Sequence, residues 1–264
     1  MIRLVRSELR KLLTTRLWWG LLIGVAFTSA AFAVLIGATS GRSLGGAAAG
    51  PGVSDPATVR SIYTAGLGVA YLFALALGVI AMAGEYRHQT MTATALASPR
   101  RLRIVMAKLV AVMILGLLYG VTAVVAGVIA GAPLIAGRGG QLRLTSDGVP
   151  RTLLLAVLAV ALWTVLGLGI GTLIRNQVLA LLLAIGIAWI AEPILSFALN
   201  ALHAGQIARF LPSQATNALV TPVASGGGVR VELLPWWGGA LTLIGYAAVA
   251  GTLGAMVTLR RDIT

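Results

Sequence analysis

The chain has 264 residues, of which 58% are hydrophobic and only 10% are charged, whereas soluble domains carry about 25% charged residues. The net charge of +13 would by itself favour a nucleic-acid partner, but the Lys and Arg residues stand beside long apolar runs, as they do in membrane proteins. The absence of cysteine excludes disulfides and thiolate metal sites. These features predict an all-α integral membrane protein that forms a single domain over residues 1–264 and binds no nucleic acid.

Residues 1–16 have the pattern of an amphipathic helix that lies in the membrane interface. Ile2, Val5, Leu9, Leu12 and Leu13 share one arc at helical spacing, while most of the cations lie opposite. The alternative is a secretory signal, with Ala31-Phe32-Ala33 as the cleavage site. Because further apolar spans follow, an interfacial helix is favoured over a signal.

Six stretches, uncharged except for one Glu, are each long enough to cross about 30 Å of hydrocarbon as a helix. They are Trp18–Gly41, Ser61–Gly84, Leu109–Gly137, Thr152–Ile174, Asn176–Leu202 and Leu233–Leu259. The orientation follows from the basic residues, because Lys and Arg are enriched in cytoplasmic loops. With both termini in the cytoplasm, 13 basic residues fall inside and 7 outside.

The longest polar interruption runs from Gly84 to Lys108 and falls on the cytoplasmic side. Tyr86 to Ser98 contains no Gly or Pro, and Pro99 then disfavours continuation of the helix. This pattern predicts a short helix at the membrane face, followed by a basic turn, that a soluble partner could bind. A solvated loop that only satisfies the topology rule is the alternative.

The outer segments differ in composition. Residues 42–60 are rich in Gly, Ala, Ser and Pro, which is typical of a flexible connection. Residues 203–232 contain Gln206–Val220, which is too short to cross and is therefore expected to form short helices at the outer ends of spans five and six. Phe210 and Leu211 are expected to face inward, and Pro212 to divide the segment.

Glu192 and Pro193 interrupt the fifth span, and two interpretations stay open. An intramembrane acid commonly faces a bundle interior or a water-filled cavity, which would indicate a transport role. Alternatively, Glu192 lies near the outer end of a helix that Pro193 breaks.

No pattern in the chain indicates an enzyme or a metal site. There is no phosphate-binding loop, and the two histidines, His88 and His203, fall on opposite sides of the membrane. Gly41–Gly45 matches G-x-S-x-G but lies in a Gly-Ala loop. Gly167-Leu168-Gly169-Ile170-Gly171 lies within a span and predicts close helix packing, and the GxxxG pairs are weak evidence for a dimer face.

The arrangement resembles the permease subunits of bacterial, in particular actinobacterial, ABC-2 type ATP-binding-cassette exporters. The resemblance rests on the N-terminal helix, the six spans, the Phe210-Leu211-Pro212 run, the closing Arg260-Arg261-Asp262-Ile263, and a cytoplasmic pattern formed by Glu85, Thr90, Ser98, Pro99, Arg100 or Arg101, and Lys108. Gln89 stands where the family often has glycine.

The resemblance implies a half-transporter in the bacterial plasma membrane. A second permease, identical or related, would complete the pathway, and two copies of a cytoplasmic ATPase would bind ATP and Mg²⁺, with no cofactor in this chain. The segment 84–101 would be the coupling helix, with Glu85, Tyr86, Arg87, His88, Gln89, Thr90, Met91, Ser98, Pro99, Arg100 and Arg101 at the ATPase interface. The extracellular gate would contain Glu192, Pro193, Phe210, Leu211 and Pro212.

Two functions from different classes therefore stand. The first is ATP-driven export of an amphiphilic or hydrophobic compound such as a drug, lipid or peptide. The second is a non-transporting membrane anchor or sensor that recruits a cytoplasmic partner through residues 84–101. The two differ in whether an ATPase co-purifies and responds to the permease.

Overall fold

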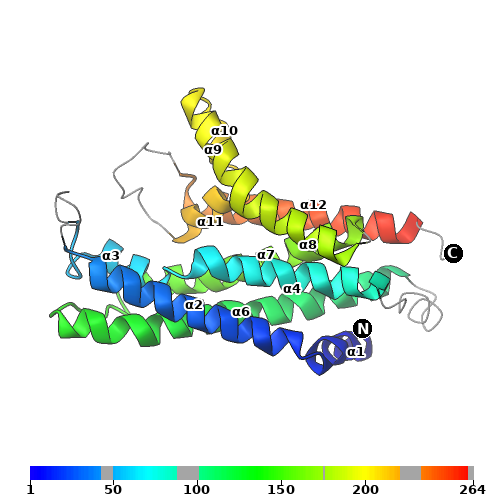
Figure 1. The fold of residues 1–264 in the computed structure, drawn as a ribbon, viewed down its shortest axis with the longest axis horizontal. Coiled ribbons are helices and arrows are strands. Elements are labelled where there is room, and N and C mark those ends of the chain that lie inside the picture. The colour runs from blue at the N-terminus through cyan, green and yellow to red at the C-terminus, as the bar shows by residue number, and fades with distance from the viewer. Residues whose placement is uncertain (43–49, 88–100, 175, 221–232, 261–264) are drawn as a thin grey trace.

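The computed structural model describes residues 1–42, 50–87, 101–174, 176–220 and 233–260, and every regular element in these residues is helical (Figure 1). In chain order the elements are α1 (Ile2–Thr14), α2 (Leu17–Thr39), α3 (Pro56–Tyr63), α4 (Leu67–Arg87), α6 (Arg101–Gly137), α7 (Val149–Leu173), α8 (Gln177–Gly186), the π-helical turn η1 (Ile187–Ala191), α9 (Glu192–Ala201), α10 (Gly205–Ala208), α11 (Pro212–Val220) and α12 (Trp236–Arg260).

Five segments of the described chain are long and apolar enough to cross a membrane: Leu17–Thr39, Pro56–Glu85, Arg103–Gly137, Val149–Leu173 and Gln177–Ala201. The prediction of an all-helical, multi-pass membrane protein is thereby confirmed. The sixth predicted span coincides with α12, a 25-residue helix that packs against α7. Arg151, in the first turn of α7, lies 3.9 Å from the ring of Trp236, at the start of α12. The crossing of the membrane by α12 stays a prediction.

Helix α7 is the centre of the bundle and packs against α4, α6 and α12. Its buried positions extend around most of its circumference, which is typical of a helix enclosed by others. At its crossing with α4 the two backbones approach through paired glycines: a Cβ on Gly78 would overlap the carbonyl oxygen of Thr164, and a Cβ on Gly167 would overlap that of Leu75. The predicted close packing of Gly167–Gly171 is therefore confirmed.

The GxxxG pairs of α6 are used inside the chain. A Cβ on Gly116 would lie 2.8 Å from Ala161 Cα, and one on Gly120 would lie 2.7 Å from Val157 Cα, both on α7. Gly127 and Gly131 pack in the same way against α3. These four glycines bring helices of one protomer together, so they do not supply the dimer face that the motif allows.

The end of the bundle that carries α3 is ordered by local caps and by arginines. Asp55 accepts the Thr58 amide and Pro56 stands in the first turn, so α3 begins inside the stretch that was predicted to be a flexible connection. That prediction was wrong for residues 56–60, which belong to α3, because Asp-Pro is a helix-start signal. Arg138 donates to the carbonyls of Gly37, Ala38 and Ser40 and so satisfies the free end of α2.

The fifth span does not end at Pro193. Pro193 lacks an amide hydrogen and its ring would clash with the carbonyl four residues earlier in a regular helix. The π-helical turn Ile187–Ala191 absorbs this conflict, with the Glu192 amide bonded to the Ile187 carbonyl, and α9 continues to Ala201. The interpretation in which Pro193 breaks the helix near Glu192 is therefore wrong.

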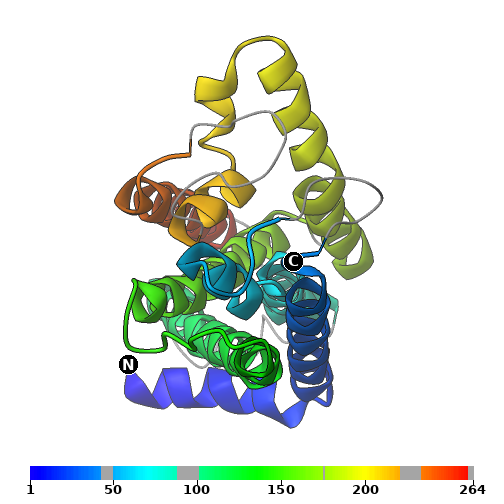
Figure 2. The ribbon, with the colours of Figure 1, turned by 90° about the vertical axis from the view of Figure 1, so that its left-hand side faces the viewer.

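Seen from the α3 end, the bundle has two attachments (Figure 2). Helix α1 lies crosswise to the bundle at one side, as expected for an interfacial helix, and packs against α6. Helices α9 and α10 project from the opposite side as an arm. The two candidate regions are separate: the ends of α4 and α6 that flank residues 88–100 lie toward the right-hand end in Figure 1, and the α9–α11 region lies left of centre, above the bundle.

Candidate functional site

The predicted ATPase-contact residues lie only partly within the described chain. Residues 88–100, and with them His88 to Met91 and Ser98 to Arg100, lie outside it. Tyr86 and Arg87 form the last turn of α4, and Arg101 begins α6. Of the predicted contacts at this end, Glu85 alone has a described side chain, and it is buried, with 7% of its surface exposed.

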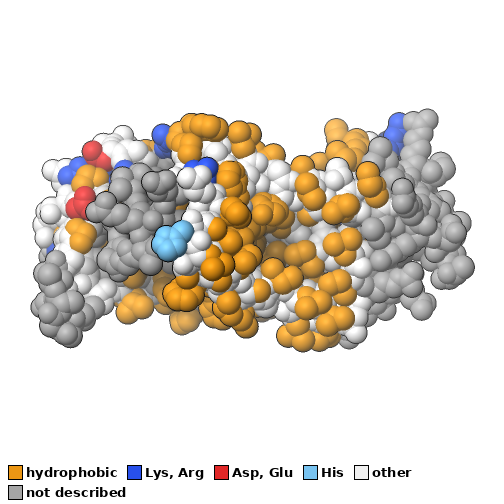
Figure 3. Space-filling view, turned by 90° about the horizontal axis from the view of Figure 1, so that it is seen from above, with side chains coloured by type: hydrophobic (Ala, Val, Ile, Leu, Met, Phe, Trp, Pro, Cys, Tyr) orange, Lys and Arg blue, Asp and Glu red, His pale blue; other side chains and the backbone are white. Residues whose placement is uncertain are grey.

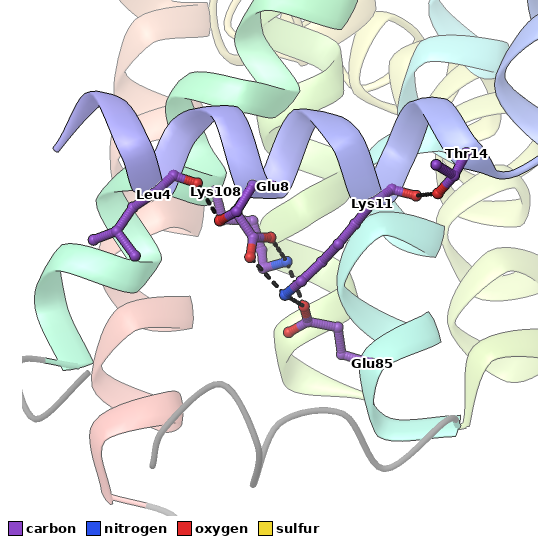
Figure 4. A network of polar contacts seen from close by, with 7 residues as sticks. Leu4, Glu8, Lys11, Thr14, Glu85 and Lys108 are labelled. Atoms are coloured by element: carbon purple, nitrogen blue, oxygen red, sulfur yellow. Dashed lines mark hydrogen bonds and ion pairs between the residues drawn. The ribbon is translucent and has the colours of Figure 1, made fainter. Parts of the chain in front are cut away.

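Glu85 belongs to a cluster of four charged side chains, Glu8, Lys11, Glu85 and Lys108 (Figure 4). The Lys108 ammonium donates to Glu8 Oε2 at 2.5 Å and to Glu85 Oε1 at 2.8 Å. Lys11 donates to Glu8 Oε1 at 2.7 Å and to Glu85 Oε1 at 3.3 Å. This charge cluster joins α1, the end of α4 and the start of α6.

Burial makes the charge cluster an internal feature and not a surface ion pair. Glu8, Glu85 and Lys108 are 3%, 7% and 5% exposed, whereas Lys11 reaches the surface. Two acids and two bases alternate, so the cluster as a whole is neutral, and the half-exposed Lys11 supplies the charge that Lys108 alone does not balance. Glu85 Oε2 is buried without a hydrogen-bond partner in the described structure. The ATPase-contact assignment of Glu85 stays a prediction, but its carboxylate is turned into the protein.

The two members of the charge cluster on α1 have shifted pKa values. Burial would raise the pKa of Glu8, but the ammonium groups of Lys108 and Lys11 outweigh burial and hold the pKa below its ordinary value of 4.5. Burial would lower the pKa of Lys11, but the carboxylates of Glu8 and Glu85 raise it above 10.5. The contribution of Glu8 to stability is therefore complete above pH 4.5 and is lost as the pH falls through its lower folded-state pKa.

We expect the packing of α1 against the bundle to be constant near neutral pH and to weaken as the pH falls below about 4.5. The Lys11 contribution is complete below 10.5 and is lost only as the pH rises through its higher folded-state pKa, so it does not act in the acid range. A spin label on Ser7→Cys, an exposed site on α1, should become more mobile in acid. The matched variant Glu8→Gln should be mobile already at pH 7. An acid transition of the same size in Glu8→Gln would contradict the assignment.

The position of Glu8 in the sequence already indicates that its side chain faces the bundle. Glu8 lies next to the apolar arc of α1, about 40° from Leu12 at 100° per residue, and so faces the bundle. Lys108 carried no comparable signal, since its two partners are 100 and 23 residues away in the sequence.

In the other candidate region, Glu192 connects the fifth span to α11. Its carboxylate is 5% exposed and accepts the Ser213 amide at 2.5 Å, at the first turn of α11. A carboxylate there satisfies a free amide and favours the positive end of the helix dipole. The interpretation that Glu192 faces the interior agrees with this position.

Helix α11 has a second attachment through α7. The Trp163 indole donates to Thr216 Oγ1 at 2.9 Å, and its ring stacks on Tyr71 of α4 with centroids 4.3 Å apart. Tyr71, Ser213 and Thr216 also line a cavity of about 390 Å³ between α3, α4 and α11. Glu192, Trp163 and Thr216 therefore hold α11 over this cavity.

The expectation for Phe210 differs from the structure. Its ring is 45% exposed, and the Arg209 guanidinium lies 5.2 Å from its centroid, so within this chain Phe210 does not face inward. Leu211 is half-buried, and Pro212 begins α11 after the separate short helix α10. Pro212 explains why α10 and α11 are separate helices, because proline is favoured in the first turn of a helix and so begins α11.

We expect Glu192→Ala to loosen α11, because a buried helix terminus loses its acceptor, at a cost of about 1–2 kcal/mol. Amide hydrogen exchange over residues 212–220 should accelerate about 5- to 30-fold. Glu192→Gln is the matched control, since its side-chain oxygen can still accept the Ser213 amide, and it should retain most of the protection. Equal protection in the Ala variant would show that Glu192 does not hold α11.

No group of three or more His, Asp or Glu side chains in the described residues is placed to hold a metal ion. The described residues form a multi-pass helical bundle with a buried charge cluster at one end and a short helix, α11, that is capped by Glu192. The chain belongs to the ABC-2 family transporter proteins, whose family model matches residues 4–190. None of the curated proteins compared with the chain matches it.

Permeases of this family are the non-catalytic membrane components of transporters and associate with an ATP-binding subunit and a second permease. The match covers the charge cluster and the segment 84–101 but ends before Glu192. Helices α9–α12 lie beyond the matched residues.

Proposed function

We propose that this chain forms, with a second permease, the pathway for ATP-driven export of an amphiphilic or hydrophobic compound. The observation that carries the proposal is the family match over residues 4–190, which spans α1 through η1. ATP and Mg²⁺ would bind to two copies of a separate cytoplasmic ATPase, held at residues 84–101. Closure of the ATPase pair would shift the permeases between two packings.

The fifth span is the surface that best fits the second permease. The fifth span and α2 are the least buried of the five long apolar segments, each with 22% burial within the chain, and α9, at the end of the fifth span, buries only Glu192 and Ser196. Hydrophobic side chains cover this side of the molecule, where α8, α9 and α12 lie (Figure 3). Its exposed apolar residues include Leu182, Ile187, Trp189, Ile190, Ile194 and Phe197. Lipid would cover a smooth bundle surface, but a projecting arm is better explained by a protein partner.

The orientation in the bacterial plasma membrane follows from the basic residues. Both termini and residues 84–101 would be cytoplasmic, with 13 basic residues inside and 7 outside. Helices α10 and α11 would then close the extracellular side, with Pro193, Phe210, Leu211 and Pro212 around the exit. The exposed Phe210 ring would meet the second permease or lipid and not the interior of its own chain.

A membrane anchor or sensor is the alternative, and an ATPase assay separates the two functions. The tagged permease should co-purify an ATP-binding subunit, and ATP hydrolysis should depend on the permease. Thr90→Trp, in the proposed contact segment, should reduce co-purification by tens-fold, as expected for a disrupted interface contact worth about 2 kcal/mol or more. Thr145→Trp is the matched control, because residue 145 is exposed at the opposite end of the bundle. A permease that binds its partner without affecting ATP hydrolysis would favour the anchor.

A further inference from the structure

The charge cluster occupies a special position in the chain. Glu85 lies two residues before the end of α4, and Lys108 lies in the second turn of α6, so the pair flanks residues 88–100 on both sides. Glu8 brings the N-terminal helix to the same point, 2.5 Å from Lys108. Three segments that are distant in the sequence therefore share one ammonium group.

We propose that Lys108 is a positioning residue that joins α1, α4 and α6 into one rigid unit, so that a displacement of the segment 84–101 moves α1 together with the two spans. The proposal rests on the proposed function, since it concerns how a movement driven by the ATPase enters the permease. It assigns α1 a mechanical role beyond anchoring in the interface.

The geometry favours a permanent contact of Lys108 with Glu8 and Glu85, which is called the joint below. Lys108 and both of its carboxylate partners are buried, so separation would leave charges in the interior without compensation. A second contact lies further along α6, where the Tyr119 hydroxyl donates to the Trp18 carbonyl at 2.6 Å. Helix α6 therefore holds the N-terminal region at two points, one on α1 and one at the start of α2.

The other face of α1 shows why such a joint would matter. Arg3, Arg6 and Arg10 are exposed there, in the orientation that suits anionic headgroups. Helix α1 thus has a face for the membrane surface and a face fixed to the spans. Movement of the unit would carry this charged face along the interface.

The first test replaces the shared ammonium. In the assembled transporter, Lys108→Met should lower transport per ATP hydrolysed by about tenfold or more, because two buried carboxylates lose a partner. Lys108→Arg should retain coupling, since a guanidinium can bridge both carboxylates. Arg103→Met, which removes an exposed cation on the same helix, α6, should transport like the parent. A Lys108→Met permease that inserts and transports like the parent would overturn the proposal.

The second test measures the joint directly and does not depend on the stability of Lys108→Met. The chain has no cysteine, so spin labels can be placed at Ser7→Cys on α1 and Ile129→Cys on α6, both exposed. The label distance, roughly 30 Å along α6, should be the same with and without trapped ATP. Glu8→Gln should broaden the distribution.

A shift in the distance when ATP is trapped would show that α1 moves separately, and an unbroadened distribution in Glu8→Gln would show that the charges do not hold it. Either result would overturn the rigid joint. The labelled permease can also be measured alone in nanodiscs. If the parent shows no ATP-driven transport while Glu8→Gln still broadens the distribution, the proposed function fails and the joint stands.

Discussion

Gly167→Leu should abolish the folded permease, because no space exists for a side chain where α7 crosses α4. Even a Cβ at this position would lie 3.0 Å from Leu75 Cα and 2.8 Å from the Leu75 carbonyl carbon, and these are backbone atoms that cannot rotate away. Overpacking costs about 1–3 kcal/mol where side chains can adjust, and more is expected where two backbones must separate. The amount of monodisperse protein after detergent extraction is the measurement.

The chain offers matched controls for this substitution. A Cβ on Gly186 in α8 or on Gly84 in α4 would meet no atom within 4 Å. Gly186→Leu and Gly84→Ala should therefore extract like the parent, and Ala in place of Gly84 should add about 0.5–1 kcal/mol of helix propensity. If Gly167→Leu is extracted in the same yield and state as Gly186→Leu, α4 and α7 do not cross as described.

Glu85→Lys should uncouple the permease while leaving its spans inserted. The change replaces an acid of the charge cluster with a third ammonium, beside Lys11 and Lys108, and leaves Glu8 as the cluster's single carboxylate. Like charges about 4 Å apart repel by about 4 kcal/mol at an effective dielectric constant of 20. Insertion depends on the apolar spans and should persist, whereas α1 should separate from α4 and α6, and transport should fall below detection.

Asp147→Lys is the matched control, because it also reverses an acid that pairs with a base. Asp147 bonds to Arg143 in an exposed loop, where water and salt screen the pair, so it contributes little to stability. Transport should therefore change little. Equal loss of transport in both variants would indicate a general effect of reversed charge, and normal transport in Glu85→Lys would contradict the assigned geometry.

The sequence was sufficient for what depends on local pattern. The apolar length of the spans predicted the helices, and Gly167–Gly171 predicted a close helix crossing that α4 provides. The pattern could not show the partner of Glu85, because Lys108 and Glu8 approach only when three helices assemble. Glu85 was therefore predicted as a surface contact, although its carboxylate points inward.

The same limit explains the outer region. Pro193 indicated a broken helix, because a sequence shows the missing amide but not the π-helical turn that accommodates it. Glu192 was recognised as unusual, yet its partner Ser213 lies 21 residues further along the chain. Asp55-Pro56 was a readable helix start within a Gly-rich and Ala-rich stretch, and the overall composition concealed it.

The π-helical turn has a consequence for the spacing of residues along the fifth span. Ala180, Ala184, Ala188, Glu192 and Ser196 are all buried and recur at every fourth position. In a regular α-helix such a series would drift by about 160° around the axis from its first member to its last. The extra residue in the turn removes about 100° of that drift and keeps the series on one side.

Geometrically, the turn acts as one extra residue in a helix whose buried positions are four residues apart. The extra residue brings the carboxylate of Glu192 to the side where α11 begins, and it leaves the apolar residues between the alanines on the other sides. The turn thus lets one span present a buried acid in line with its small residues while its large apolar residues stay exposed.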